Sequence, residues 1–392
     1  MDKPTSKIPF NKPFIAGKEL YNIAQSVVNN HLAGDGPFTK LSNKWLETNL
    51  HCTKALLTHS CTGALEMAAI LCDIEPGDEV IMPSFTFVST ANAFVLRGAV
   101  PVFVDIRPDT LNMDEQKIEA AITSNTKAIV PVHYAGVPCV MDKIMEIADQ
   151  CGVWVIEDAA QALLSTYKGK FLGTIGHLGC LSFHETKNII SGEGGALLIN
   201  SERFIERAEI IREKGTNRIK FFRGEVDKYT WVDIGSSYLP SELIGAFLFA
   251  QMEQAEIIIE ARRRIFERYY QSLLPLKNKG LVRLPFVEKN GSGNGHTFYI
   301  IVRSPNERSR LLEYLDKSGI NAVFHYVPLH SSPAGMKYGR VSGDMKITDA
   351  LNNRLLRLPM FYEMKDEDVD RVAKAVSSFY VNLQVKPDNH LI

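Results

Sequence analysis

Short apolar runs alternate with helical patterns through the first half of the chain, and this alternation limits the folds open to it. Several runs are apolar almost throughout, as in strands buried on both faces. Strands that alternate with helices build a largely parallel sheet covered on both sides. The sequence therefore predicts an α/β fold with a mostly parallel seven-stranded sheet, and the turn-like link between the last two runs allows a mixed sheet. The runs are ALLTHS (55–60), EVIMPS (79–84), VPVFVDI (100–106), AIVPVHY (128–134), VWVIEDA (153–159), GCLSFHE (179–185) and GALLIN (195–200).

The second half of the chain has a different pattern. A long helical stretch covers about 240–273, and we expect it to end near LLPLKNKG, where Pro275 and Gly280 break it. Since 392 residues suggest about two domains, we predict a large α/β domain over 1–255. A smaller α+β domain over 256–392 follows, linked by the long helix. Its expected strands cover 296–302 and 321–327, and its expected helices cover 306–318 and 366–382.

Charge and composition exclude several classes of protein. A net charge of −1 gives no electrostatic support for a nucleic-acid partner, and no apolar run approaches the roughly 20 residues that span a bilayer. The first residues lack the apolar core of a signal peptide, and the six cysteines are scattered, which favours reduced thiols. We therefore expect a cytoplasmic protein. The sequence shows no metal-ligand spacing, no GxGxxG and no P-loop.

Polar residues gather where the predicted strands end. In open α/β sheets, ligands bind outside the carboxyl ends of the strands. These side chains are therefore expected to converge on one crevice, and their convergence is stronger evidence than any one of them. They are Ser60 and Thr62, Ser84, Thr86 and Phe87, His133 and Tyr134, Glu157 and Asp158, and Ser182, His184 and Lys187.

Each of these residues also has a simpler explanation. Thr62 begins a helix whose free N–H groups suit a phosphate, but it would equally serve as a helix cap. Asp158 follows an apolar strand and suits a cationic partner such as a protonated pyridine nitrogen, or it caps the segment AAQAL. Phe87 offers a ring for stacking on an aromatic cofactor, although a phenylalanine here is more often core.

Lys187 also has two explanations, an exposed surface lysine or a reactive amine. A lysine beyond a strand end is usually exposed, but one with a pKa lowered by burial or by nearby positive charge forms Schiff bases. The presence of Ser182 and Asp158 at neighbouring strand ends favours the second interpretation. The glycines of SGEGG (191–195) also let the backbone turn closely beside the site.

Two motifs together carry a resemblance to a known family. DAAQ (158–161) followed by SFHETKN (182–188), with the earlier PSFTFVSTANA (83–93), resembles the DegT/DnrJ/EryC1/StrS sugar aminotransferases of fold type I. The resemblance extends from IPFNKPF near the N-terminus to LLRLPMFYEM near the C-terminus. It implies pyridoxal 5'-phosphate as cofactor and a homodimer with shared active sites.

The resemblance also implies roles for single residues. Lys187 would form the Schiff base, Asp158 would pair with the pyridinium nitrogen, and Gln161 would bond the phenolic oxygen of the cofactor. Related dehydratases have histidine in place of this lysine, so Lys187 favours transamination. The other implied cofactor contacts are Thr62, Gly63 and Ser182 at the phosphate, Phe87 on the ring, and Ser237. The implied substrate contacts are His184, Arg218, Lys220, Arg223 and His325.

The implied reaction moves an amino group from L-glutamate to C4 of dTDP-4-keto-6-deoxy-D-glucose. The products would be dTDP-4-amino-4,6-dideoxy-D-galactose, a precursor for enterobacterial common antigen or O-antigen, and 2-oxoglutarate. Another keto-sugar nucleotide or the gluco epimer stays open, as do a lyase or desulfurase and a non-catalytic binding protein on the same fold.

The sequence departs from the family pattern at two places. GSSYL (235–239) stands where many relatives have a GxNxR segment that reaches the partner subunit, so Ser237 or Tyr238 would have to substitute. The loop SGEGG after the lysine segment is one residue shorter than expected. For the basic residues of 214–228, a solvated loop is as good an explanation as contact with a sugar-nucleotide diphosphate.

Overall fold

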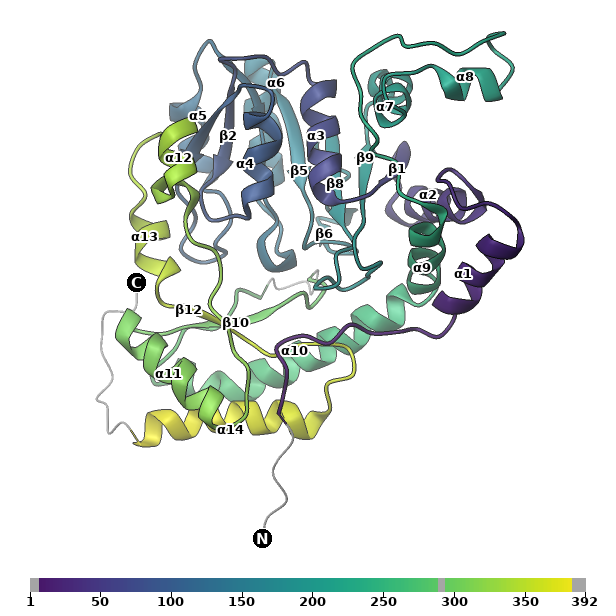
Figure 1. Cartoon of the computed structure of the whole chain (residues 1–392). Helices are drawn as coiled ribbons and strands as arrows, with labels where there is room; N and C mark the ends of the chain where they lie inside the picture. The colour runs from purple at the N-terminus through teal and green to yellow at the C-terminus, as the bar shows by residue number, and fades with distance from the viewer. Residues whose placement is uncertain (1–6, 288–292, 383–392) are drawn as a thin grey trace.

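The computed structural model describes residues 7–287 and 293–382. Its main element is the sheet in the upper part of Figure 1, which has the strand order β1-β9-β8-β5-β4-β2-β3-β11. The order and the parallel pairs confirm the prediction of a mostly parallel α/β sheet. The strands are β1 (Lys54–Thr58), β2 (Glu79–Pro83), β3 (Val100–Val104), β4 (Thr126–Ile129), β5 (Trp154–Asp158), β8 (Leu178–Ser182), β9 (Gly195–Ile199) and β11 (Arg340–Val341).

Two details of the sheet go beyond the prediction of seven strands. Strand β9 is antiparallel to both of its neighbours, β1 and β8, so the sheet is mixed where the turn-like link indicated. The eighth strand, β11, joins β3 in parallel from the far end of the chain. With two residues it carries no periodicity that a sequence pattern can reveal.

Helices cover both faces of the sheet because the strands are apolar on both faces. One core lies under α3 (Cys61–Leu71), α4 (Val88–Val95) and α7 (Ile205–Arg212). On the other face, α5 (Ile118–Ala121) and α6 (Met141–Cys151) cover one half. The other half lies under α2 (Pro37–Leu50) and α9 (Glu242–Met252). Successive residues of one strand alternate between these cores, as the two-residue period requires.

The long helical stretch is two helices. After α9 the chain turns at Glu253 and Gln254, and α10 (Ala255–Asn278) begins. The expected end near LLPLKNKG is confirmed, because α10 ends at Asn278, two residues before Gly280 at φ 66°, but Pro275 does not break the helix. Pro275 removes one N–H, but the carbonyl it would have met belongs to the exposed Gln271, where water can replace the bond.

A second core forms around α10. It takes up β10 (Phe298–Ile301), β12 (Leu355–Leu358), α11 (Pro305–Lys317) and α14 (Asp366–Asn382), and Figure 1 shows α14 lying along α10. β10 and β12 pair antiparallel in a two-stranded ribbon. The expected strand at 321–327 is reduced to one bridge, Val323 with Arg357, and β12 was not expected. The division of the chain at residue 255 stays a prediction.

The chain after this ribbon returns to the large sheet. The backbone N–H of Leu329 donates to the carbonyl oxygen of Ser84 at 3.0 Å. Asp105, at the end of β3, accepts hydrogen bonds from Ile347 N and Thr348 N, each at 2.8 Å, at the start of α13 (Lys346–Asn352). These bonds hold the segment around 323–330 against the carboxyl ends of the strands. Among the described residues, no helix is both long and apolar enough to cross a bilayer.

Two adjacent carboxylates at the end of β5 face opposite ways. Glu157 is fully buried and accepts hydrogen bonds from the backbone N–H groups of Gly173 (2.8 Å), Ile175 (2.7 Å) and Gly176 (2.6 Å). His133 Nε2 completes its partners at 2.8 Å. Since neighbouring side chains of a strand point to opposite faces, Asp158 faces the other side.

The four partners of Glu157 predict a large stability effect. In Glu157→Gln, an amide –NH2 would face backbone donors, so we expect the free energy of unfolding to fall by about 2–3 kcal/mol. Urea denaturation followed by circular dichroism measures this loss. The exposed Glu260→Gln on α10 is the matched control and should stay within about 0.5 kcal/mol of the parent. Equal midpoints for the two variants would contradict the role given to Glu157.

Candidate active site

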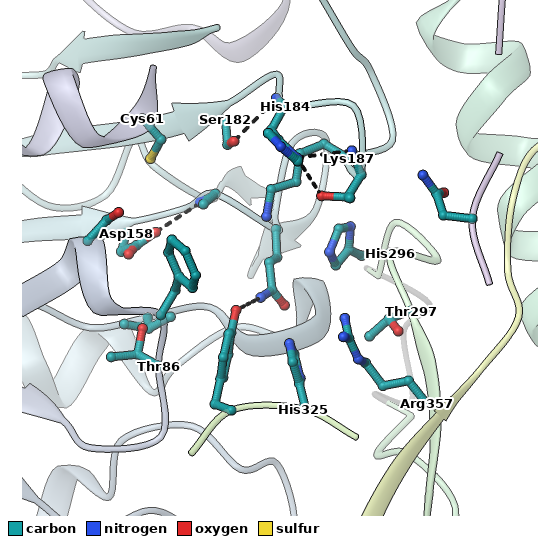
Figure 2. A pocket seen from close by; sticks show the side chains of 18 of the residues that line it. Cys61, Thr86, Asp158, Ser182, His184, Lys187, His296, Thr297, His325 and Arg357 are labelled. Carbon is teal, nitrogen blue, oxygen red and sulfur yellow. Dashed lines mark hydrogen bonds between the residues drawn. The ribbon is translucent and has the colours of Figure 1, made fainter. Parts of the chain in front are cut away.

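A pocket of about 730 Å³ lies where the strands of the large sheet end. The loops after β2, β5 and β8 form one wall, and the segments around 296–297, 323–326 and 357–360 form the opposite wall. Figure 2 shows side chains from both walls pointing toward one another. The volume suits a cofactor together with part of a substrate.

Asp158 faces this pocket, and hydrogen bonds from neighbouring residues fix its carboxylate. Its Oδ2 accepts a hydrogen bond from Thr90 Oγ1 at 2.7 Å, and Thr90 is bonded in turn to Thr86 Oγ1 at 2.8 Å. Its Oδ1 accepts one from Ala160 N at 3.2 Å, but no helix begins there. The cap explanation for Asp158 is therefore wrong in this structure. Instead, a 5 % exposed carboxylate lines the pocket without an ion-pair partner in the described part of the chain.

Lys187 extends into the same pocket from the loop between β8 and β9. Its backbone N–H donates to His184 O at 2.8 Å, which fixes the turn. Burial lowers the pKa of the Lys187 amine below its ordinary value, the charges of Cys61 and Asp158 oppose this, and the charge of Arg357 lowers it further. A lower pKa increases the neutral fraction of the amine at a given pH, and the neutral amine is the form that acts as a nucleophile or base.

The start of α3 lies beside the lysine with its cap already filled. Ser60, not Thr62, is the cap, since its Oγ accepts from Gly63 N at 3.0 Å. Thr62 is thereby free to line the pocket, where its hydroxyl donates to Ser89 Oγ at 2.8 Å. Gly195 packs so closely on this turn that a Cβ would lie 2.4 Å from Cys61 N. The first turn of a helix, with two hydroxyls beside it, is suited to bind an anion.

Phe87 and Gln161 lie on either side of this arrangement. Phe87 is 55 % exposed and lines the pocket, so the core explanation for it is wrong. Gln161 is fixed at both ends of its amide, because Oε1 accepts from Ala135 N at 2.7 Å and Nε2 donates to Tyr326 Oη at 2.6 Å. Burial raises the pKa of the Tyr326 hydroxyl, which stays protonated.

Both predicted histidines also line the pocket. His184 lies nearer the entrance, with Nδ1 2.9 Å from Thr186 Oγ1 and Nε2 3.8 Å from Glu193 Oε1. His325 is deeper, and its Nδ1 lies 2.7 Å from Tyr134 Oη. Burial lowers the pKa of His325 well below its ordinary value, and the charges of Arg357 and Lys187 act in the same direction. The imidazole is therefore neutral.

Five predicted site residues do not line this pocket in the single chain: Gly63, Ser237, Arg218, Lys220 and Arg223. Ser237 is exposed, and its backbone forms an isolated antiparallel β-bridge with Glu213. Tyr238 is buried in the core under α3. The basic side chains of the short helix α8 (Arg218–Phe222) and its end are engaged with acids. The N–O distances are 3.9 Å for Arg218 to Glu213, 2.5 Å for Lys220 to Glu206 and 2.7 Å for Arg223 to Glu209.

The pocket also contains residues that the sequence did not reveal. Thr90 behind Asp158 belongs to the quoted motif PSFTFVSTANA and had a signal there, as the fourth residue after Thr86. Tyr326, His296 and Arg357 had none: His296 and Tyr326 lie in the expected strands 296–302 and 321–327, but no motif there pointed to this pocket, and β12, which carries Arg357, was not expected. They are placed only by the return of the C-terminal segment to the sheet.

The fold, with an aspartate and a lysine in one pocket at the ends of neighbouring strands, is that of the fold-type I aminotransferases. Comparison with known proteins gives the family. Residues 14–377 match the model of the DegT/DnrJ/EryC1/StrS aminotransferase family, and the chain belongs to this family.

Three relatives illustrate the match. The spore coat polysaccharide biosynthesis protein SpsC of Bacillus subtilis is 33 % identical, over 94 % of this chain and 96 % of its own length. GDP-perosamine synthase of Escherichia coli O157:H7 is 32 % identical, over 95 % and 98 %. The sugar aminotransferase Spr1654 of Streptococcus pneumoniae, solved in its PLP form, superposes with a TM-score of 0.88 at 25 % identity, over 97 % and 100 %.

The protein is therefore a sugar aminotransferase with pyridoxal phosphate as its cofactor, and its residues fit that group. The pocket presents the carboxylate of Asp158, which has no cationic partner within 7–287 and 293–382, an amine with a lowered pKa at Lys187, and a helix start with the Thr62 hydroxyl at its edge. These are the acid, the amine and the anion site that a phosphorylated pyridine aldehyde requires.

The lowered pKa of Lys187 predicts how the cofactor-free protein reacts with pyridoxal phosphate. Only the neutral amine attacks an aldehyde, and a lowered pKa increases the neutral fraction at any pH below the ordinary lysine value of about 10.4. Relative to Nα-acetyl-lysine, the rate of colour formation should therefore rise at lower pH. The absorbance of the coloured adduct, followed from pH 6 to 10 with the cofactor-free protein and with Nα-acetyl-lysine, checks this. A midpoint equal to that of the free lysine would contradict it.

Proposed function

We propose that this protein moves the amino group of L-glutamate to C4 of dTDP-4-keto-6-deoxy-D-glucose. The products are dTDP-4-amino-4,6-dideoxy-D-galactose, for a surface polysaccharide, and 2-oxoglutarate. The observation that carries the transamination is that one pocket holds both Lys187, with its lowered pKa, and the carboxylate of Asp158, which has no ion-pair partner among the described residues. Membership of a sugar aminotransferase family supports the sugar substrate.

Each residue has a distinct task in this proposal. Pyridoxal phosphate supplies a carbonyl for the amino group and a ring that accepts electrons when it is bound. Lys187 Nζ removes the proton from the α-carbon of the donor, and its lowered pKa leaves it able to accept that proton. Asp158 keeps the ring nitrogen protonated by its negative charge, and Thr90 fixes the carboxylate for this at 2.7 Å.

The remaining pocket residues bind and orient. Thr62, Gly63 and Ser182 hold the phosphate, and Gln161 holds the phenolic oxygen in a position set by its bonds to Ala135 and Tyr326. Phe87 stacks on the ring, for which its exposed position leaves room. His184 and His325 approach the sugar.

We also propose that the working form is a cytoplasmic homodimer. The segment that contains α8 carries large apolar side chains in the open, with Phe222 67 % and Trp231 78 % exposed. Such a patch is typical of a protein interface. In a dimer, Ser237 and the basic residues Arg218, Lys220 and Arg223 would approach the partner's pocket, although their present pairing with acids supports the solvated-loop alternative equally.

A second candidate differs in the nucleotide. The relative from Escherichia coli O157:H7 is named for a GDP-linked product and is 32 % identical over nearly the whole chain, which favours a GDP-linked keto sugar. Incubation with glutamate and either dTDP-4-keto-6-deoxy-D-glucose or its GDP-linked counterpart, followed by NMR of the product, separates the two. The coupling constants at C4 also separate the galacto from the gluco epimer.

Replacement of the lysine tests the chemistry itself. In Lys187→Ala the base and the covalent anchor are both lost, so turnover should fall at least about 10³-fold while pyridoxamine phosphate still binds. Formation of 2-oxoglutarate from glutamate and the keto sugar measures turnover. The exposed Lys170→Ala, on β7 (Lys170–Phe171), is the control and should match the parent.

Two outcomes would reject the proposal. Robust turnover in Lys187→Ala would show that the lysine is not the base. A purified protein that stays colourless after addition of pyridoxal phosphate would support a binding protein on the same fold. A yellow protein that bleaches with glutamate but releases a product from the amino acid alone would support the lyase alternative.

A further inference from the structure

Three arginines gather at one edge of the core around α10, outside the active-site pocket. Arg283 lies in the segment that bridges the end of β10, Arg308 belongs to α11, and Arg354 directly precedes β12. Figure 1 shows α11 beside the ribbon of β10 and β12. None of the three arginines lines the pocket, so the transamination proposed above makes no use of them.

Hydrogen bonds bring these arginines to one place. Arg283 exchanges two backbone hydrogen bonds with the last residue of β10, at 2.8 and 2.9 Å. The next residue, Val302, donates its backbone N–H to Arg354 O at 3.1 Å. From α11, Arg308 Nη1 donates to Asn352 O at 3.1 Å, two residues before Arg354. Three segments of the chain therefore each bring one guanidinium group to the end of β10.

The guanidinium groups have few partners for their degree of burial. Nε and Nη2 of Arg283, and the Nε atoms of Arg308 and Arg354, are buried without a hydrogen-bond partner in the described part of the chain. Glu307, beside Arg308 in the sequence, pairs with Arg303 instead, at 2.9 Å. Removing a charge from water without a partner is costly, so an anion from solution would be favoured here.

The one carboxylate whose charge acts on Arg283 is already neutralised. Asp109 accepts hydrogen bonds from Arg107 Nε at 3.1 Å and from Arg107 Nη2 at 3.0 Å. Burial lowers the pKa of Arg283, and the charge of Arg354 lowers it further, so the two guanidinium groups are close enough to repel each other. The site therefore has an excess of positive charge.

The number and directions of the donors indicate the kind of anion. A single carboxylate has two oxygens in one plane and neutralises one of the three charges. A phosphate group carries up to two charges, and its oxygens point in several directions, so it can accept hydrogen bonds from guanidinium groups on three segments at once. The paired N–H donors of arginine also match the spacing of phosphate oxygens.

We propose that Arg283, Arg308 and Arg354 form a second anion site, separate from the active-site pocket, that binds a phosphate-bearing ligand. Because its residues come from three segments, the bound ligand fastens α11 to the ribbon of β10 and β12. The proposal does not depend on which amino acid or keto sugar the enzyme uses.

Inorganic diphosphate and the cofactor-loaded, full-length protein test the proposal. Calorimetry gives the affinity for the parent and for Arg283→Glu, Arg308→Gln and Arg354→Gln. Arg310→Gln changes an exposed arginine on α11 and is the matched control. The melting temperature is measured with diphosphate and with potassium chloride at equal ionic strength. The absorbance of the cofactor reports any diphosphate that enters the active-site pocket.

Affinity and stability should change together in a specific way. Arg283→Glu should weaken diphosphate binding at least about 10-fold, because it replaces donors with a negative charge, and the two glutamine variants should each weaken it about 3- to 10-fold. Without diphosphate, Arg283→Glu should melt about 1–3 °C above the parent, because the new carboxylate can pair with Arg354. Diphosphate should raise the melting temperature of the parent but not of Arg283→Glu.

Other results would overturn the proposal. Equal affinities in the parent, Arg283→Glu and both glutamine variants would exclude the cluster and assign the diphosphate to another place, the active-site pocket if the cofactor absorbance changes. An equal stabilisation by potassium chloride would show a response to ionic strength only. Equal binding of malonate, a small dicarboxylate, would reject phosphate as the preferred class. The two glutamine variants carry the affinity test by themselves if Arg283→Glu does not fold.

Discussion

The hydrogen bond between Thr90 and Asp158 connects the fold to the chemistry of the pocket. It joins α4 to the end of β5, at 2.7 Å, and with the bond from Ala160 N to the other oxygen it holds a buried carboxylate in a fixed position. That is possible because Glu157, next to it, faces the other side of the sheet and satisfies three backbone N–H groups there. One acid secures the loop after β5, and the other is left facing the pocket. Consecutive residues of a strand can divide in this way because they point to opposite faces.

Much of the large domain could be predicted from the sequence for a physical reason. Strands buried on both faces appear as apolar runs, and all seven runs became strands within a few residues of their expected bounds. The pocket residues at the ends of these strands could be predicted with them, since parallel strands all deliver their ends to one edge. Asp158, Ser182 and Lys187 were brought together for this reason and not through any property of the single residues.

The second half of the chain resisted prediction because its placement depends on contacts far apart in the sequence. β12 has four residues and β11 has two, too few for a period to show. The segment that contains His325 and Tyr326 is extended mainly by the bridge between Val323 and Arg357. The turn onto the sheet at Leu329 depends on a bond to Ser84, more than 200 residues earlier. No local pattern carries that information, so Tyr326 and Arg357 stayed hidden.

The two walls of the pocket therefore differ in origin and in charge. The wall from the sheet carries the negative carboxylate of Asp158 and the helix start at Thr62, and the wall from the ribbon carries the positive guanidinium of Arg357. Lys187 lies between the two walls, and charges on both act on its pKa. Asp158 raises this pKa and Arg357 lowers it, while burial lowers it more than either charge changes it. The pKa of the amine therefore depends on how the two walls lie relative to each other. Any change in how the ribbon is seated on the sheet would alter this balance, so the long-range bonds of Ser84 and Asp105 support the chemistry as well as the fold.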